Sequence, residues 1–514
     1  MEQNNAYDKL PYSNNILPQT HPDVLSSFAS LQGLTPPDIQ KSRILELGCG
    51  NGLNLICHAA DLPESEFIGI DLAENHIEKA KATAKRFAVG NVNFHQKDLM
   101  KLSESDFGKF DYIIAHGLIS WVPQAVRDKT FSIFSKLLSE NGIGYLSYNT
   151  YPVWHYVQML RNIGRLHARD ITDSTEAAES AMTFLDLLTE CVPPDTIYKS
   201  ILKQETDFMK QLPKTSAVHD MFGEINEAFY FVDFVSELKK NGLKFAAEVE
   251  NLSTRFNSLP PRAFEFIDAI DDVIWREQYL DFFVGRAFRQ TLVCHEEIET
   301  GYLVEPSAFE NFFLASSLRP VSKEPELQTQ KPEKFLGAQG RVIESAHPLT
   351  KTALYELGNR WGNTVHYSKL LNDSREALTK FGFPAEDWTK EFEAARSLLL
   401  TVHMQTDLLE VHTYQKEVDT SVGKKPAVKK LARMAVEEAD FVLLEYNRGM
   451  RIEDPLLRKL LELADGSRTM DEIESELVSF VKSSDEIEDK ERVIGNLSIK
   501  AEIDRFAYLG LFSG

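Results

Sequence analysis

The chain has 514 residues, 43% of them hydrophobic, and a formal net charge of −22. Its length predicts two to four domains, and its apolar fraction excludes a disordered chain. A surface this acidic repels phosphate backbones, so we expect no nucleic-acid partner.

The N-terminal residues lack a basic and apolar leader, and no apolar run is long enough to span a bilayer. We therefore expect a cytoplasmic protein without membrane insertion. Four cysteines are scattered without CxxC spacing, and no histidine pair has HExxH spacing. These patterns predict reduced thiols and no bound metal; the cysteines are Cys49, Cys57, Cys191 and Cys294.

Residues 41–150 alternate short apolar runs with amphipathic helices, which predicts an α/β fold with a parallel sheet. Helices are expected after Gly52, after Asp71 and after Pro123, and the second of these should stop at Gly90. The five expected strands are Arg43–Leu47, Phe67–Ile70, Val92–Gln96, Phe110–Ile114 and Ile143–Tyr148. Ligands of such sheets bind at the carboxyl ends of the strands.

The sheet is expected to resume after a helical insertion at about 170–225. A helix face around Phe231 is closed by Asn241-Gly242, and Leu243–Val249 then alternates like a strand. Arg289–Cys294 is predicted to be the last strand, antiparallel to its neighbours, after a second insertion at about 251–285. The alternative is a separate helical domain over 151–300.

The C-terminal half predicts two mostly helical, winged-helix-like modules. Residues 346–414 predict three helices and a strand, and 427–512 have a similar pattern, with a capping box at Thr469–Glu472. The acidic stretch Ser484–Glu491 argues against DNA binding, which favours a protein-binding or scaffolding role. Residues 321–341 are expected to form a linker or an exposed hairpin.

The first strand runs into three alternating glycines, with Glu46 two residues before the first. Bare backbone of this kind lets a nucleotide-type ligand approach closely. A carboxylate such as Asp71 can accept both ribose hydroxyls, and Asp98 can accept from an adenine amino group. Glu46 would repel the pyrophosphate of NAD but attract a sulfonium and an ammonium, which favours S-adenosylmethionine. The predicted cofactor-binding residues from these segments are Glu46, Gly48, Cys49, Gly50, Asn51, Gly52, Asp71, Leu72, Asp98, Leu99 and His116.

A polar and aromatic cluster follows the fourth and fifth strands and predicts the acceptor site. The turn Ala115–Leu118 lacks the Asn-Pro-Pro-Tyr pattern of enzymes that methylate nucleobase amines. Aromatic faces stabilise ammonium groups, and desolvation favours loss of a proton from lysine. The predicted catalytic residues are His116, Trp121, Tyr148, Asn149 and Tyr151, with Ser120, Trp154 and His155 nearby. Plain packing is the alternative for His116, Tyr151, Trp154 and His155.

These residues together resemble bacterial protein lysine methyltransferases, including rickettsial enzymes that methylate outer-membrane proteins. The resemblance rests on five N-terminal motifs, on a segment similar to the end of a methyltransferase regulatory domain, and on two C-terminal motifs. In order these are 7–12, 20–22, 46–50, 116–123, 148–152, 288–295, 318–320 and 347–351. This chain departs from the family pattern at Ile119 and Val153, near the acceptor side.

The resemblance implies class I methyltransferase architecture and an N-terminal segment that folds over the cofactor, where Tyr12 and His21 would bind. It also implies a protein substrate, namely an outer-membrane or secreted protein, and a homodimer. The expected domains are a cap at 1–40, the cofactor domain at 41–165, a regulatory and dimerisation region at 166–303, a connecting segment at 304–345 and a winged-helix-like domain at 346–514. The expected activity is methyl transfer to the ε-amine of lysine. The alternatives are a small-molecule methyltransferase or a non-catalytic S-adenosylmethionine-binding regulator.

Overall fold

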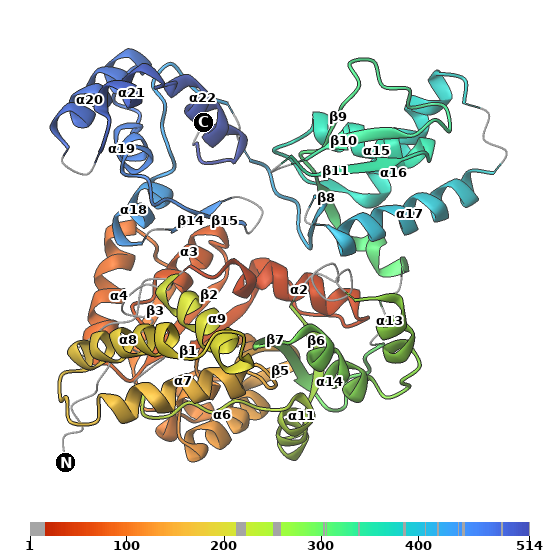
Figure 1. Ribbon diagram of the computed structural model, residues 1–514. Helices are drawn as coiled ribbons and strands as arrows, with labels where there is room; N and C mark the ends of the chain where they lie inside the picture. Colours follow the sequence, from red (N-terminus) through yellow and green to blue (C-terminus); the bar gives the residue numbers. More distant parts are fainter. Residues whose placement is uncertain are drawn as a thin grey trace.

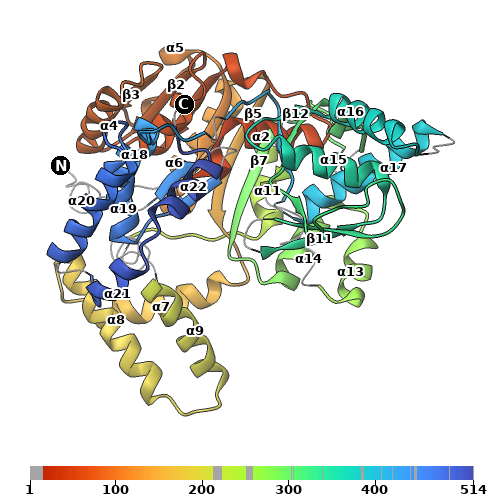
Figure 2. The same cartoon turned by 90° about the horizontal axis from the view of Figure 1, so that it is seen from above.

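The computed structural model describes residues 16–211, 223–249, 259–301, 304, 306–337, 340–383, 387–406, 408–418, 421–439, 441–444, 448–484 and 487–512. A large sheet domain forms one half of the molecule. Two C-terminal modules lie side by side on it, above the sheet domain in Figure 1. Figure 2 shows the same two modules from above, on either side of the chain that connects them.

The sheet has seven strands in the order β3-β2-β1-β4-β5-β7-β6. Strands β1 to β5 are parallel, and β7 pairs antiparallel with both β5 and β6. This confirms the expected Rossmann-like sheet, its antiparallel last strand and its resumption after the insertion. The strands are β1 Arg43–Leu47, β2 Glu66–Asp71, β3 Val92–Gln96, β4 Phe110–Ala115, β5 Leu138–Asn149, β6 Leu243–Glu248 and β7 Phe288–His295.

Helices cover both faces of the sheet. On one face, α3 and α4 bury apolar residues in the same core cluster as Ile44 of β1; on the other, α6 and α11 pack through Phe131 and Phe234. The helices are α2 Pro22–Leu31, α3 Leu53–Asp61, α4 Glu74–Phe87, α5 Glu104–Phe107, α6 Gln124–Leu137 and α11 Phe231–Lys240. Four short 3-10 turns join them, η1 Pro18–Thr20, η2 Ile39–Lys41, η3 Leu99–Lys101 and η4 Ile119–Trp121. Helix α4 ends earlier than expected, because Ala88 already adopts the left-handed conformation at φ 59° and terminates it before Gly90.

The two insertions are helical. The first contains α7 Trp154–His167, α8 Ser174–Cys191 and α9 Ile197–Gln211, which pack around a small core of their own and extend away from the sheet in Figure 2. The second contains α13 Pro261–Asp268 and α14 Val273–Val284. Because β6 and β7 belong to the central sheet, the alternative of a separate helical domain over 151–300 is wrong.

The first C-terminal module has more strand than the sequence suggested. Two three-stranded sheets, β11-β10-β9 and β12-β8-β13, accompany its helices. The segment 304–345, expected to be connecting chain, carries four of these strands. The elements are η5 Pro306–Asn311, β8 Phe313–Ala315, β9 Arg319–Pro320, β10 Glu333–Leu336, β11 Val342–Ser345, α15 Pro348–Asn359, β12 Val365–His366, α16 Tyr367–Lys380, α17 Trp388–Gln405 and β13 Glu410–His412.

The second C-terminal module combines helices with one hairpin. Its elements are α18 Lys430–Glu438, β14 Phe441–Leu444, β15 Arg448–Arg451, α19 Pro455–Leu463, α20 Met470–Ser483, α21 Lys490–Gly495 and α22 Ile499–Tyr508. The expected capping box is present, with Thr469 and Glu472 satisfying each other's backbone N–H groups. Together the two modules confirm a mostly helical C-terminal region.

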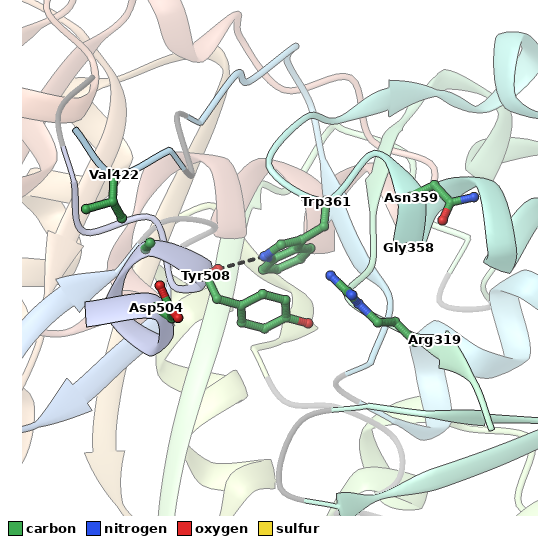
Figure 3. A pocket seen from close by; sticks show the side chains of 8 residues that line it. Arg319, Gly358, Asn359, Trp361, Val422, Asp504 and Tyr508 are labelled. Atoms are coloured by element: carbon green, nitrogen blue, oxygen red, sulfur yellow. Dashed lines mark hydrogen bonds between the residues drawn. The ribbon is translucent and has the colours of Figure 1, made fainter. Parts of the chain in front are cut away.

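The two modules meet at an aromatic contact. The indole Nε1 of Trp361 donates to the carbonyl oxygen of Tyr508 at 2.6 Å, and the two rings lie 5.4 Å apart. Figure 3 shows this contact with Arg319 beside Tyr508. These residues line a pocket with a volume of about 570 Å³. None of the residues lining this pocket belongs to the glycine loop or the aromatic cluster of the sheet domain.

The segment after β13 returns to the N-terminal part of the sheet domain. Buried Asp23 accepts hydrogen bonds from Thr413 N and Oγ1, both at 2.8 Å, and lies 2.7 Å from Nδ1 of His412. Asp61 lies 2.9 Å from Nζ of Lys416 and accepts from the Tyr414 hydroxyl at 3.0 Å. These contacts attach the C-terminal half to α2 and α3.

One buried guanidinium joins the last two strands to α14. Arg289 on β7 is fully buried and contacts Glu248 of β6 at 3.0 Å. It also contacts two acids of α14, Glu277 at 3.2 Å and Asp281 at 2.8 Å. Burial alone would lower the pKa of Arg289, but these acids raise it, so the group stays cationic.

No helix among the described residues is both long and apolar enough to cross a bilayer. The same part of the chain contains no group of three or more histidine, cysteine or acidic side chains placed to hold a metal ion.

We expect Arg289→Ala to lower the free energy of unfolding by about 3–5 kcal/mol, because removing the cation leaves buried carboxylates uncompensated. Thermal unfolding followed by calorimetry measures the loss. Arg451→Ala is the matched control, since its pair with Glu453 is exposed and should contribute less than about 1 kcal/mol. Equal effects of the two substitutions would contradict the role of the cluster.

Candidate functional site

The glycine loop, residues 48–52, lies across the end of β2. Gly48 N and Cys49 N both donate to the carbonyl oxygen of Ile70, at 2.8 and 3.1 Å. Gly50 N donates to Oδ2 of Asp71 at 2.9 Å. The predicted carboxylate at the end of β2 therefore holds the predicted loop directly.

The glycines of the loop are required for two different reasons. Gly48, Gly50 and Gly52 all have positive φ, at 72°, 53° and 74°. A Cβ on Gly52 would lie 2.5 Å from Phe94 and 2.8 Å from Ala80, so this position is set by packing. A Cβ on Gly50 would have no atom within 4 Å. Gly50 therefore borders open space in which a ligand could lie against the backbone.

Glu46 ends β1 beside this loop and is 4% exposed. Its Oε1 accepts from Asn54 Nδ2 at 3.1 Å, whereas its Oε2 has no hydrogen-bond partner among the described residues. Burial raises the pKa of the Glu46 carboxyl to about 7, against the opposing effect of Asn54 and with a further contribution from Asp71. A buried acceptor without a donor fits a cationic ligand that would restore its charge.

Asp71 and Asp98 both support turns at strand ends. Oδ1 of Asp71 accepts from Ala73 N at 2.9 Å, and Oδ1 of Asp98 accepts from Met100 N at 2.9 Å, where it caps η3. Each carboxylate retains lone pairs for ligand hydroxyl or amino groups. Leu72 is 59% exposed and Leu99 is partly buried, so each can offer an apolar surface to a ring.

The remaining loop residues have plain environments. The side chain of Asn51 folds back so that its Oδ1 accepts from Leu53 N at 3.4 Å. Burial, together with Asp71 and Glu46, raises the pKa of the Cys49 thiol well above its usual value. The thiol is therefore protonated near neutral pH and unsuited to act as a nucleophile.

The residues expected from the N-terminal segment are placed differently. Tyr12 lies outside the described residues. His21 is fully buried, caps α2 and places its Nε2 3.3 Å from Asp61 Oδ2. Asn54 donates both to Glu46 and to Thr20 Oγ1, the latter at 3.0 Å. His21 follows Thr20 in the chain and is therefore connected to Glu46 only through other side chains. Direct binding of the cofactor by Tyr12 and His21 stays a prediction.

His116 follows β4 and has a defined proton arrangement. Its Nδ1 lies 3.0 Å from the Tyr145 hydroxyl, which donates to Oε1 of Gln290 at 3.1 Å. Since Tyr145 has a single proton, His116 Nδ1 donates to it and Nε2 keeps a lone pair. Burial lowers the pKa of His116 to about 4. The imidazole is therefore neutral near pH 7, and its free Nε2 is a hydrogen-bond acceptor but only a weak base.

Tyr151 stands in an aromatic cluster with His155 and Tyr230. The Tyr151 and His155 rings stack at 4.1 Å, and the Tyr230 ring lies 5.0 Å from Tyr151. The Tyr230 hydroxyl lies 3.3 Å from His155 Nε2. Stacked electron-rich faces of this kind stabilise a cationic or partly charged amine by roughly 0.5–2 kcal/mol.

The other predicted catalytic residues are less accessible. Asn149 is 3% exposed; its N–H donates to Ser120 Oγ at 2.9 Å, and its Nδ2 has no partner among the described residues. Trp121 packs edge-on against Trp154 at 6.3 Å. Tyr148 is 1% exposed and stacks on Phe234 at 3.7 Å, inside the core. Tyr148 therefore supports the sheet from within, and catalytic contact by these three residues stays a prediction.

Four residues near the site were not expected from the sequence. Asn54 occupies the first turn of α3, where an amide after a glycine loop is a detectable signal. Tyr230 belongs to the aromatic run 229–231 before α11. Tyr145 and Gln290 meet across β5 and β7, which lie 145 residues apart in the chain, and no local pattern marks such a pair.

Comparison with known proteins assigns the two parts of the sheet domain. Residues 39–206 match the family described as "Methyltransferase domain", and residues 214–295 match "Predicted methyltransferase regulatory domain". Protein RP789 of Rickettsia prowazekii is 33% identical over 381 residues, which cover 73% of this chain and 68% of that protein. Protein RP028 of the same organism is 33% identical over 240 residues, covering 46% of this chain and 96% of that protein.

A solved structure matches the whole architecture. PKMT2 from Rickettsia typhi, in complex with AdoHcy, superimposes with a TM-score of 0.82 at 25% sequence identity. The match covers 98% of this chain and 100% of that one. The likeness extends over the C-terminal modules as well as the sheet.

We expect affinity for S-adenosylmethionine to rise by about tenfold between about pH 6 and pH 8 and then level off. The ionised Glu46 carboxylate attracts the cationic ligand, and burial keeps this carboxyl protonated below a pKa of about 7 in the free protein. Titration calorimetry at several pH values measures the profile. Glu46→Gln is the control, because it removes the titrating carboxyl and retains any titration of the ligand itself. If this variant had the same pH profile of affinity as the wild type, Glu46 would be excluded as the cause of the pH dependence.

We expect Gly50→Ala and Gly52→Ala to separate ligand binding from packing. Gly50→Ala should weaken cofactor binding by at least about tenfold while costing about 1–2 kcal/mol of stability, the cost of a left-handed alanine. Gly52→Ala adds a clash with Phe94 and should cost about 2–5 kcal/mol. Calorimetric Kd and Tm values test both, and wild-type affinity in Gly50→Ala would show that the ligand does not approach this backbone.

Proposed function

This chain belongs to the methyltransferase family that joins a methyltransferase domain to a regulatory domain and includes RP789 and RP028, and we propose that it methylates the ε-amine of lysine in a protein. It is an S-adenosylmethionine-dependent methyltransferase. The proposal concerns the acceptor and the residues that act on it.

The observation that carries the proposal is the pair of acceptor-side features near the ends of β4 and β5. The cluster of Tyr151, His155 and Tyr230 offers aromatic faces suited to an alkylamine. His116 offers an unprotonated Nε2 on a buried ring. The abbreviation PKMT stands for protein lysine methyltransferase. The likeness to PKMT2 therefore supports lysine as the acceptor.

Lysine requires a base or desolvation before it can accept a methyl group, because its usual pKa is near 10.4. In the proposed reaction the desolvated ammonium loses its proton to solvent, and His116 Nε2 accepts a hydrogen bond from the resulting amine while Nδ1–H stays bonded to Tyr145. The aromatic cluster orients the amine and excludes water from it. When bound, S-adenosylmethionine supplies a methyl group on a sulfonium, whose sulfur keeps the bonding electrons on transfer. Orientation of the amine supplies much of the rate of such a displacement.

The wider biological setting belongs to the same proposal. The acceptor is an outer-membrane or secreted protein, the enzyme acts in the cytoplasm, and it acts as a homodimer. The resemblance in the motifs at 116–123 and 148–152 supports the acceptor and the homodimer. The cytoplasmic setting is supported by the lack of an apolar run long enough to span a bilayer.

A tritiated methyl donor tests the acceptor class. The protein is incubated with S-adenosylmethionine labelled in the methyl group and either cell-envelope protein or a small-molecule extract. We expect label in lysine of the protein fraction, identified after acid hydrolysis. Label confined to the small-molecule extract indicates a metabolite methyltransferase. Binding of the donor without transfer to either fraction indicates a regulatory binder.

We expect His116→Ala to lower kcat by at least about tenfold, because the amine loses the hydrogen bond that orients it, with cofactor Kd changed by less than about twofold. Tyr145→Phe is the matched variant, because it retains the ring stacked on His116 but removes the oxygen that fixes the imidazole tautomer. Its kcat should fall less than that of His116→Ala. Equal losses in kcat and in cofactor affinity would indicate a packing role for His116.

A further inference from the structure

Helix α14 is exposed on its aromatic side. Trp275 is 48% exposed, Phe282 44% and Phe283 45%, and with the half-buried Tyr279 they recur at spacings of three and four residues. Side chains at these spacings share one face of a helix. The opposite side carries Glu277 and Asp281, which are buried against Arg289. The usual amphipathic arrangement is therefore reversed, with acids inside and aromatic rings outside.

The exposed rings are continuous with the acceptor cluster. Tyr279 lies 6.2 Å from Trp275 and 6.0 Å from Phe282, and Phe282 lies 6.1 Å from Tyr230. Tyr230 in turn lies 5.0 Å from Tyr151. We call the rings of Trp275, Tyr279, Phe282 and Phe283 the α14 stripe. One end of this stripe reaches the cluster proposed to hold the lysine.

Helix α13 widens the stripe and adds negative charge. Phe266, 49% exposed, lies 5.3 Å from Tyr279 and 5.8 Å from Phe283. Glu265 and Asp268 flank it on the same helix and are exposed, and neither forms an ion pair within the described parts of the chain. A surface with bare aromatic rings beside unpaired acids complements a segment that carries apolar and basic side chains.

We propose that the α14 stripe is a docking track for an extended, lysine-containing segment of the acceptor protein, with a large apolar side chain seated near Trp275. This inference rests on the proposed function. The path from Trp275 through Tyr279 and Phe282 to Tyr230 consists of ring contacts of 6.2, 6.0 and 6.1 Å, so it is at most about 18 Å long. An extended chain covers that length in about five or six residues. The seated apolar side chain therefore lies about five residues from the lysine that is methylated.

Peptide binding tests the track without requiring turnover. A fluorescein-labelled peptide with one lysine and a tryptophan five residues away is compared, in both sequence directions, with the same peptide carrying serine in place of tryptophan. We expect the tryptophan peptide of one direction to bind at least about tenfold more tightly. Trp275→Ala should abolish this difference and leave binding of the serine peptide unchanged.

Phe381→Ala is the control, since Phe381 is 69% exposed at the end of α16 and remote in sequence from the stripe. It should leave both peptides bound as in the wild type. Phe283→Ser provides a second variant on the stripe. We expect it to weaken binding of the tryptophan peptide, as Trp275→Ala does.

Three results would overturn the inference. The first is equal binding of the tryptophan and serine peptides, and the second is an unchanged difference between them in Trp275→Ala. The third is that Trp275→Ala converts a dimer to a monomer, measured by light scattering, and leaves peptide binding unaffected. That result would mean that a second copy of the chain covers the stripe. Failure of the proposed function has a different signature, in which the tryptophan peptide binds through Trp275 but tritiated methyl groups are never transferred to protein.

Discussion

The acceptor side of this molecule depends on the buried contacts of Arg289. The guanidinium joins Glu248 on β6 to Glu277 and Asp281 on α14 and so fixes the last strands and the aromatic helix together. Glu248 also accepts from Thr291 Oγ1 at 3.0 Å and from Gln290 N. Gln290 then sets the proton arrangement of Tyr145 and His116. Hydrogen bonds thereby connect the ion cluster around Arg289 to His116 at the end of β4.

Features encoded by neighbouring residues were predictable from the sequence. Five parallel strands, the glycine loop and the capping box at Thr469 were all expected and are present. Each depends on a period of two or four residues or on one conformational requirement, such as the positive φ of Gly50. The cofactor followed from the same short stretch, because Glu46 lies two residues from the first glycine. The comparisons confirm that prediction.

Features that depend on contacts between distant segments were not predictable. The hairpin alternative for 321–341 is present in part as the β10–β11 pair. The pairing with β9 was missed, because β9 has two residues and such a short strand exists only through pairing with β10. Tyr148 follows the alternation of β5, but only the arrival of Phe234 makes it a core residue. The contact of His21 with Asp61 at 3.3 Å had no signal in the sequence, since the two residues lie on separate elements. Gln290 lacks any local signal, since its partner is 145 residues away.

The contacts of Asp23 with His412 and Thr413 have a consequence for the order of synthesis. Their separation of about 390 residues means that a ribosome making 5–20 residues per second needs roughly 20–80 s to supply the partners of Asp23. Lys416, the partner of Asp61, emerges at the same stage. Until then Asp23 lacks the hydrogen bonds from Thr413, and Asp61 lacks its contact with Lys416. The final packing of α2 and α3 against the C-terminal half is therefore completed only after most of the protein has been translated.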